Sequence, residues 1–473
     1  MRSLSLAMTI AIAGCGEAGP GGEPELPLAI SGSPAATDTV GAAPVQGLVV
    51  DVRDPSGALS QGKTVRFTAI PATRKGVPTV SMLVAVNSNA FGPVAMATTN
   101  DRGRAVALVK FGSVAGPGGI EIAVPEFRLI DTVSFTIVPG NLAAVRLEPG
   151  DTVVAIGATV AIRSGVVDRV GNPRSDPISF STASIPTGAG TVTPAGQVSV
   201  SQAGQVRVIG AAADRADTVT LSVVPAGKIV GYDALTRRFV ETNLDGSGER
   251  PLSDRLDPSS LREPAWSPDG TAIAFEHLRR LWILSLATGA ITAYPNIPDG
   301  YWPAFSPDAQ QIYFTAADDD TRRIARINRD GSGFTVLTPG RFDGRPSVSS
   351  DGKTLVYETF AGGSQIAKYD LVSGTVQSTL RPGYYPEWSP AGDRIAYFSE
   401  QGGIRLMNPD GSNDQSLLSE HVGVMDQLSW SPDGRWLLAA NQGMIEIIGV
   451  AAEVRGVVIR RMFTHLDGVI WRP

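Results

Sequence analysis

The chain has 473 residues, a formal net charge of −6 and no run of lysine and arginine, which argues against a nucleic-acid partner. Its 53 glycines and 34 prolines suit short strands joined by tight turns, and no long segment shows the 3.6-residue apolar period of a helix. The composition therefore predicts an all-β protein, and the length allows several domains.

Residues 1–26 are predicted to be an export signal followed by a flexible tether rich in Gly, Pro and Glu. The apolar run over 4–12 is too short to cross a bilayer and ends in Ile-Ala-Gly-Cys15, which resembles the bacterial lipobox. This resemblance implies that Cys15 is lipidated. Because Gly16 rather than Asp follows it, the resemblance also favours anchoring to the outer membrane of a bacterial cell envelope. The alternative is an ordinary signal peptide with an incidental cysteine.

Residues 27–225 contain an internal repeat. Residues 131–139 and 217–225 share an Asp-Thr-Val start, apolar residues at alternate positions and a closing Pro. Such alternation buries one face of a strand, and turn signals recur every 8 to 12 residues, as in antiparallel sandwiches. The pattern predicts two domains of this kind, over 27–140 and 141–225.

Each unit also has a strand that runs into a polar turn. The second unit has Asp168, a Gly-Asn-Pro turn at 171–173 and a strand containing Phe180. These residues resemble the bacterial immunoglobulin-like domains of invasin and intimin. The first unit differs, because its turn reads Asp-Pro-Ser-Gly at 54–57. The resemblance implies two Ig-like domains that act as spacers.

Residues 226–473 repeat with a period near forty residues. Each period contains a Trp-Ser-Pro-Asp-Gly phrase or a close variant, at positions 266–270, 305–309, 348–352, 388–392 and 430–434, with a clipped copy at 471–473. This period with a fixed turn is typical of a β-propeller, and four strands fit each period. The phrase Asp is expected to cap its own turn, and the phrase Trp or Phe to pack between blades.

The ends of this region predict how the ring closes. The last copy of the phrase stops at Pro473, and its missing half resembles residues 225–230. We therefore expect one blade to combine an inner strand from 467–473 with outer strands from 228–252, which makes six blades. Such closure removes an open sheet edge.

The repeats resemble the TolB-like propeller, whose blades carry the same phrase. The resemblance covers about 245 residues and implies a six-bladed binding scaffold. Two sandwiches stand where TolB has an α/β domain, so its link to the Tol–Pal envelope system does not transfer directly. The expected fold is all-β, with two Ig-like β-sandwiches followed by a six-bladed propeller.

The candidate ligand site is the channel mouth on the rim opposite the stereotyped turns, where loops vary and binding residues gather. A pair of residues precedes each predicted inner strand and is expected to converge there. The binding residues predicted from these pairs are Arg262, Glu263, Tyr301, Trp302, Arg345, Tyr384, Tyr385 and Asp426. Solvated residues without a ligand are the alternative.

No catalytic residue, cofactor or resident metal is predicted. His277, His421 and His465 fall in loops of this rim, where propeller lyases hold a metal, but converging ligands with supporting partners are needed for such a site. The expected function is non-catalytic binding of an envelope protein or glycan by a protein that is expected to be a monomer. The alternative is a propeller enzyme, a polysaccharide lyase or a hydrolase, with its site on the same rim.

Overall fold

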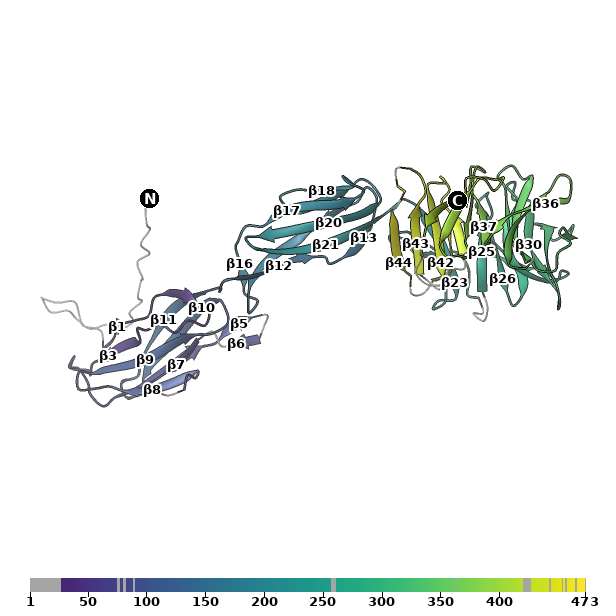
Figure 1. The fold of residues 1–473 in the computed structure, drawn as a ribbon. Helices are drawn as coiled ribbons and strands as arrows, with labels where there is room; N and C mark the ends of the chain where they lie inside the picture. Colours follow the sequence, from purple (N-terminus) through teal and green to yellow (C-terminus); the bar gives the residue numbers. More distant parts are fainter. Residues whose placement is uncertain are drawn as a thin grey trace. The chain divides into compact units, whose positions relative to one another are not determined.

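The computed structural model describes residues 27–74, 77–79, 82–87, 90–256, 261–360, 362–419, 427–441, 444–452, 454–455, 457–463 and 466–472 (Figure 1). These residues form strands and one 3-10 helix, Pro125–Phe127, so the predicted all-β class is confirmed. In this part of the chain, no helix has the length and apolar character needed to cross a membrane. By its contacts the chain divides into two compact units, one containing residues up to 146 with 165–177 and 212–215, the other containing 147–164, 178–211 and 216–473.

The first strands form two sheets around one core. The first sheet has the strand order β1 (Leu28–Gly32), β3 (Leu48–Val52), β9 (Arg104–Phe111) and β7 (Met82–Ala85). The second sheet has the order β2 (Thr37–Thr39), β11 (Leu129–Val138), β10 (Gly116–Val124), β4 (Thr64–Ile70) and β8 (Val94–Thr98). A two-stranded sheet pairs β5 (Ala72–Arg74) with β6 (Val77–Thr79). Alternate residues of β9 are buried, and Phe111 meets Phe135 of the facing sheet with ring centroids 5.6 Å apart.

Residues 142–224 form three smaller sheets. They are β12 (Leu142–Glu148), β15 (Arg163–Asp168) and β16 (Pro173–Arg174); β13 (Thr152–Ala155), β21 (Arg215–Val224), β20 (Gly204–Ala212) and β17 (Ser179–Ile185); and β14 (Thr159–Ala161), β19 (Gln197–Val200) and β18 (Gly190–Val192). The predicted alternation is present, since Val219, Leu221 and Val223 are buried. The sheets are not purely antiparallel as expected, because β2 pairs with β11, and β13 with β21, in parallel.

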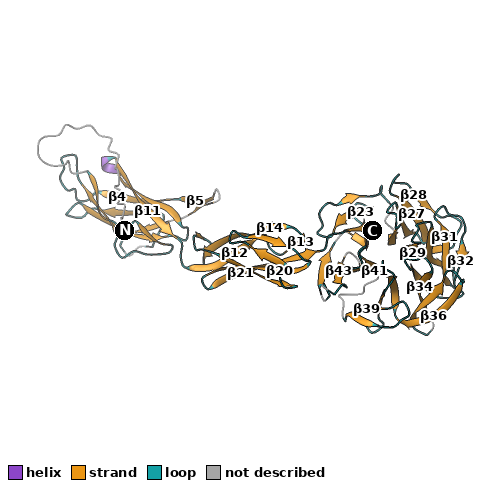
Figure 2. Cartoon of the chain, turned by 90° about the horizontal axis from the view of Figure 1, so that it is seen from above, coloured by secondary structure: helices purple, strands orange, loops and turns teal. Residues whose placement is uncertain are grey.

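Residues 228–471 form six four-stranded sheets, which we number as blades 1 to 6. Blade 1 is β45 (Leu466–Trp471), β22 (Lys228–Asp233), β23 (Arg238–Asn243) and β24 (Arg250–Pro251). Blade 2 is β25 (Leu261–Trp266), β26 (Ala272–His277), β27 (Arg280–Ser285) and β28 (Ile291–Ala293). Blade 3 is β29 (Asp299–Phe305), β30 (Gln311–Ala317), β31 (Arg322–Asn328) and β32 (Thr335–Val336). Blade 4 is β33 (Asp343–Val348), β34 (Thr354–Phe360), β35 (Ser364–Asp370) and β36 (Thr375–Pro382). Blade 5 is β37 (Tyr384–Trp388), β38 (Ile395–Phe398), β39 (Ile404–Met407) and β40 (Gln415–Leu418). Blade 6 is β41 (Gln427–Trp430), β42 (Trp436–Asn441), β43 (Met444–Gly449) and β44 (Val458–Met462). In Figure 2 the blades form a ring, with β29 and β41 toward its centre and β32 and β36 at its periphery.

Blade 1 confirms the predicted closure of the ring. The last strand, β45, pairs antiparallel with β22, so that Ile229 lies opposite Trp471. The side chain of Glu241 is fully buried in this blade and accepts bonds from Lys228 at 2.7 Å, from Arg250 at 3.0 Å and from Arg472 beyond the end of β45. A buried carboxylate needs such partners, and here they join the closing strand to the rest of the blade.

Hydrophobic clusters fill the spaces between neighbouring blades, including the space between blades 6 and 1. The aromatic residues that open the phrase are in these clusters and are mostly buried, namely Trp266, Phe305, Trp388, Trp430 and Trp471. Their predicted role in packing between blades is therefore confirmed. The stability of each blade depends on its two neighbours, because their facing surfaces supply the apolar contacts.

The phrase forms the same turn in blades 2 to 6. The Ser267 hydroxyl donates to the Asp269 carboxylate at 2.6 Å, and equal bonds join Ser306 to Asp308 and Ser431 to Asp433. The bond from Ser306 lowers the pKa of Asp308, as expected for a carboxylate that caps a turn. The fourth copy lacks this Asp, and there Ser389 donates at 2.8 Å to Asp393 instead. The predicted turn-capping role of the phrase Asp is confirmed.

Candidate functional site

The inner strands change their register at the same point in successive blades. In β25, β29, β33 and β37 a β-bulge interrupts the pairing with the second strand. Four non-glycine residues at these bulges have left-handed backbone conformations with φ between 50° and 54°, namely Glu263, Trp302, Arg345 and Tyr385. Gly468 of β45 has φ 57°. A bulge re-aims a side chain, and a left-handed non-glycine residue is uncommon.

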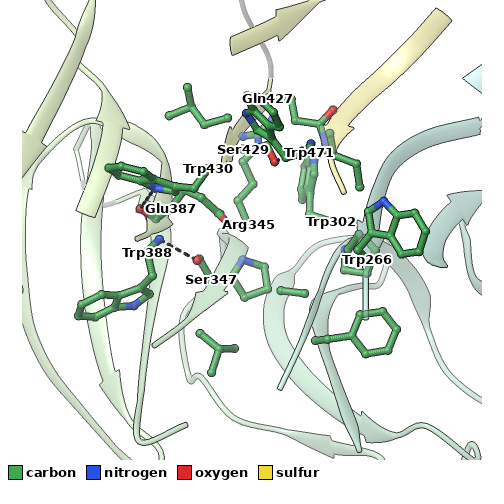
Figure 3. Close-up of a pocket in the computed structure, with 18 of the residues that line it drawn as sticks. Trp266, Trp302, Arg345, Ser347, Glu387, Trp388, Gln427, Ser429, Trp430 and Trp471 are labelled. Atoms are coloured by element: carbon green, nitrogen blue, oxygen red, sulfur yellow. Dashed lines mark hydrogen bonds between the residues drawn. The ribbon is translucent and has the colours of Figure 1, made fainter. Parts of the chain in front are cut away.

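These bulges border the central channel of the propeller. The channel encloses about 490 Å³, and the side chains of Glu263, Trp302, Arg345, Tyr385 and Gln427 contribute to its wall. Figure 3 shows Trp302, Arg345 and Gln427 around this common space. In the pairs at 301–302, 344–345 and 384–385, the second residue lines the channel and the first does not.

The predicted pairs lie inside the inner strands and not in the loops before them. The strands already begin at Leu261, Asp299, Asp343 and Tyr384. The observed positions differ from the predicted ones because each inner strand continues past its bulge toward the variable rim. A Pro follows the bulge residue in four blades, as in Glu263-Pro264 and Trp302-Pro303, and this repeated X-Pro step was the available sequence signal.

Arg345 is held between two aromatic rings. Its guanidinium carbon lies 4.1 Å from the ring centroid of Trp302 and 3.5 Å from that of Tyr385, and it donates to Glu358 at 2.8 Å and to the Tyr385 hydroxyl. The Arg345 backbone N–H donates to Thr315 at 3.1 Å. Stacking and charge pairing together fix the planar guanidinium, so blades 3, 4 and 5 present a preformed wall.

The remaining predicted binding residues have different surroundings. Tyr301 accepts a bond from Arg279 at 3.0 Å and borders a separate rim cavity of about 570 Å³. Tyr384 stacks on Phe398, with ring centroids 5.6 Å apart, and so belongs to the packing of blade 5. The Arg262 side chain and the whole of Asp426 lie outside the described residues.

Deeper in the channel, the structure adds a carboxyl group that the sequence analysis did not select. Glu387 lies in the wall two residues after the bulge at Tyr385, and burial there raises its pKa to about 8, against a hydrogen bond with Ser347 that lowers it. Ser347 also accepts the backbone N–H of Trp388 at 3.0 Å, and the indole of Trp430 donates to the Glu387 carbonyl at 3.2 Å (Figure 3). These bonds join inner strands of successive blades.

Of the three histidines, the structure describes only His277. This residue is buried, and its ring lies 5.5 Å from that of Trp282, whose indole donates to the His277 carbonyl at 2.9 Å. His421 and His465 lie outside the described residues. Across the residues that the structure covers, no group of three or more His, Cys, Asp or Glu side chains is arranged to hold a metal ion.

Comparison with known proteins identifies the ring. Residues 236–465 match the family described as the TolB beta propeller domain. The propeller of this chain is therefore similar to a TolB-type β-propeller, and the matched segment contains the bulges of blades 2 to 5. Residues 1–235 lie outside the matched segment.

Curated relatives match in part. An uncharacterized protein of Agrobacterium fabrum is 28% identical over 158 residues, which cover 29% of this chain and 53% of that protein. The Tol-Pal system protein TolB of Francisella tularensis subsp. holarctica is 28% identical over 189 residues, which cover 36% of this chain and 43% of that protein. The chain thus spans about half the length of the curated relatives it matches. Among solved structures, TolB from Acinetobacter baumannii aligns with a TM-score of 0.45 and 15% identity, covering 70% of this chain and 100% of that one.

Proposed function

We propose that this chain is a non-catalytic lipoprotein of the bacterial cell envelope, whose propeller binds a protein or glycan partner at the channel mouth. The relatives named as Tol-Pal system proteins favour a protein among these partners. The observation that carries the proposal is the group of bulge residues that line the channel in left-handed conformations.

The bulges support a binding role because the backbone of a bulge can adopt this conformation without any side chain. Gly468 adopts the same conformation in blade 1 without a side chain, whereas Glu263, Trp302, Arg345 and Tyr385 adopt it with one. A non-glycine residue in this region costs on the order of 1–3 kcal/mol. Four such costs around one channel are consistent with a site in which side-chain position matters more than local stability.

The remaining regions complete the proposal. Residues 27–140 and 141–225 are Ig-like spacer domains, and Cys15 is the lipidated residue that anchors the protein to the outer membrane. The sheets around a shared core in the first region are compatible with a spacer. Residues 1–26, including Cys15, lie outside the described residues, so the anchor rests on the lipobox resemblance.

Arg345→Ala tests the channel mouth. Loss of the guanidinium should weaken partner binding by about 1–3 kcal/mol, because a central, well-packed Arg typically contributes that much to an interface. The partner is first captured from envelope extracts with the wild-type protein and identified, and its dissociation constant is then measured by calorimetry for each variant.

Two further variants make this test specific. Tyr385→Phe keeps the ring packed against the core of blades 5 and 6 but removes the hydroxyl that accepts from Arg345. Lys353→Ala changes an exposed residue just after the phrase turn in blade 4, on the opposite rim. Binding that survives Arg345→Ala and Tyr385→Phe but fails with Lys353→Ala would place the site on the other face.

A further inference from the structure

Two polar residues are buried at the Gly-Asn-Pro turn of residues 171–173. Asp168 is 3% exposed and Asn172 is 1% exposed. The Asn172 backbone N–H and side-chain amide each donate to the Asp168 carboxylate at 2.8 Å, and the Val170 N–H donates at 3.0 Å. These local bonds hold the two side chains in one fixed arrangement.

The same two side chains also bond to segments distant in sequence. The Asn172 amide donates to the Ser113 carbonyl at 2.8 Å, and its oxygen accepts the Ala115 N–H at 3.0 Å, both in the loop between β9 and β10. The Asp168 carboxylate accepts the Gly140 N–H at 2.9 Å. Each bond satisfies a backbone group that would otherwise need another partner.

Arg174 adds a third contact on the same segment. Its guanidinium donates to the Gly140 carbonyl and is paired with Asp176 at 2.6 Å. Both polar groups of the Gly140 residue are therefore bound by side chains of this turn and the short strand after it. The division of the chain by contacts groups residues 165–177 with the first unit, although the sequence pattern assigns them to the second domain.

The corresponding turn of the first domain provides an internal comparison. Asp54 accepts the backbone N–H groups of Ser56 at 2.9 Å and Ala58 at 3.1 Å, and its bonds stay within four residues. The described bonds of the Asp54 carboxylate are thus local to its own turn. The long-range bonds of Asp168 and Asn172 are therefore not a requirement of turn formation.

We propose that Asp168, Asn172 and Arg174 form a latch that holds the β9–β10 loop and the Gly140 segment, so that these segments open only together with the turn. A polar cluster of this kind couples the segments it joins, because breaking one bond leaves a buried partner unsatisfied. The latch makes residues 165–177, which the sequence pattern assigns to the second domain, part of the cooperative unit of the first. The bonds from two separate side chains to Gly140, and from Asn172 to Ser113 and Ala115, carry this inference.

Hydrogen–deuterium exchange of the full chain, read by mass spectrometry, tests the latch. In Asn172→Ala, peptides covering 112–117 should exchange at least about tenfold faster than in wild type, because the Ala115 N–H loses its acceptor. In Asp168→Asn, which keeps the shape of the side chain, peptides covering 138–142 should exchange faster because the Gly140 N–H loses a charged acceptor. Asp168→Asn carries the test if Asn172→Ala does not fold.

Asp54→Asn is the matched control, since it weakens the equivalent turn of the first domain. With this variant, the peptides covering 112–117 and 138–142 should exchange at the same rate as in wild type. The latch is overturned if Asp168→Asn leaves peptides 138–142 unchanged, or if Asp54→Asn accelerates the same peptides equally. Acceleration spread evenly over all strands from β1 to β21 would also overturn it, because a latch opens only the segments that it holds.

Discussion

Glu387 shows that the surroundings of a residue in the channel wall can alter its pKa in a way that the neighbouring sequence does not reveal. This residue is half-buried in the channel wall, between the inner strands of neighbouring blades. Burial disfavours the charged form and raises the pKa from 4.5 to about 8. At neutral pH this group is therefore mostly protonated and can donate a hydrogen bond into the channel.

Glu387→Gln should reduce the dependence of stability on pH. An acid with a raised pKa binds its proton more tightly when folded, so wild-type stability falls as pH rises from about 4.5 to about 8. The neutral amide cannot ionise, and the variant should melt higher than wild type by a margin that grows from pH 5 to pH 8.5. Calorimetric melting at both pH values measures this margin.

Glu249→Gln is the control for this comparison, because Glu249 is exposed on the hairpin between β23 and β24. It should shift the melting temperature equally at both pH values. If the margin between Glu387→Gln and wild type is the same at pH 5 and pH 8.5, Glu387 titrates as an ordinary carboxyl group and the channel wall does not exclude water from it.

At the scale of elements, β45 is the strand on which the ring depends. It pairs with β22, its Trp471 lies in the cluster between blades 6 and 1, and its Trp471 N–H donates to Ser429 of blade 6 at 3.1 Å. Arg472, just beyond it, pairs with the buried Glu241. The strand therefore contributes backbone pairing, apolar contacts and a charge partner at one joint.

Removal of residues 466–473 should lower stability severely and promote aggregation. Glu241 would lose one of its three cations, and β22 would become an exposed edge. Thermal melting and light scattering of the truncated protein measure both effects. Arg472→Ala, which keeps the strand, should show a smaller loss. A truncated protein that melts like wild type would contradict the role of β45.

The sequence predicted these elements well because repetition makes the pattern visible. The recurring phrase identified six blades, the capping Asp and the packing Trp, and the half-copy at 471–473 identified the closing strand. The bulges were not predicted, because a left-handed residue such as Trp302 or Arg345 depends on the register of two strands and not on its own preference. The Arg345 stack was also beyond prediction, since it joins side chains of three blades.

For the whole molecule, the proposed attachment to a membrane depends on Cys15. Cys15→Ser should release the protein from the membrane fraction into the soluble fraction, because a lipid-modified cysteine supplies the apolar chains that hold it there. Fractionation of cells and immunoblotting measure the distribution. Gly16→Ala is a control that keeps the cysteine and should stay with the membranes. An unchanged distribution of Cys15→Ser would rule out the lipid anchor.

The pairing of β22 with β45 also determines when the propeller is finished. Blade 1 contains the earliest strands of the ring and one strand from its end, with Ile229 opposite Trp471. During synthesis β22, β23 and β24 are made before β45 and must wait for it before their sheet is complete. Contacts between such distant positions slow folding and leave strand edges exposed meanwhile. A chaperone that covers the edge of β22 would therefore protect this protein until β45 has been made.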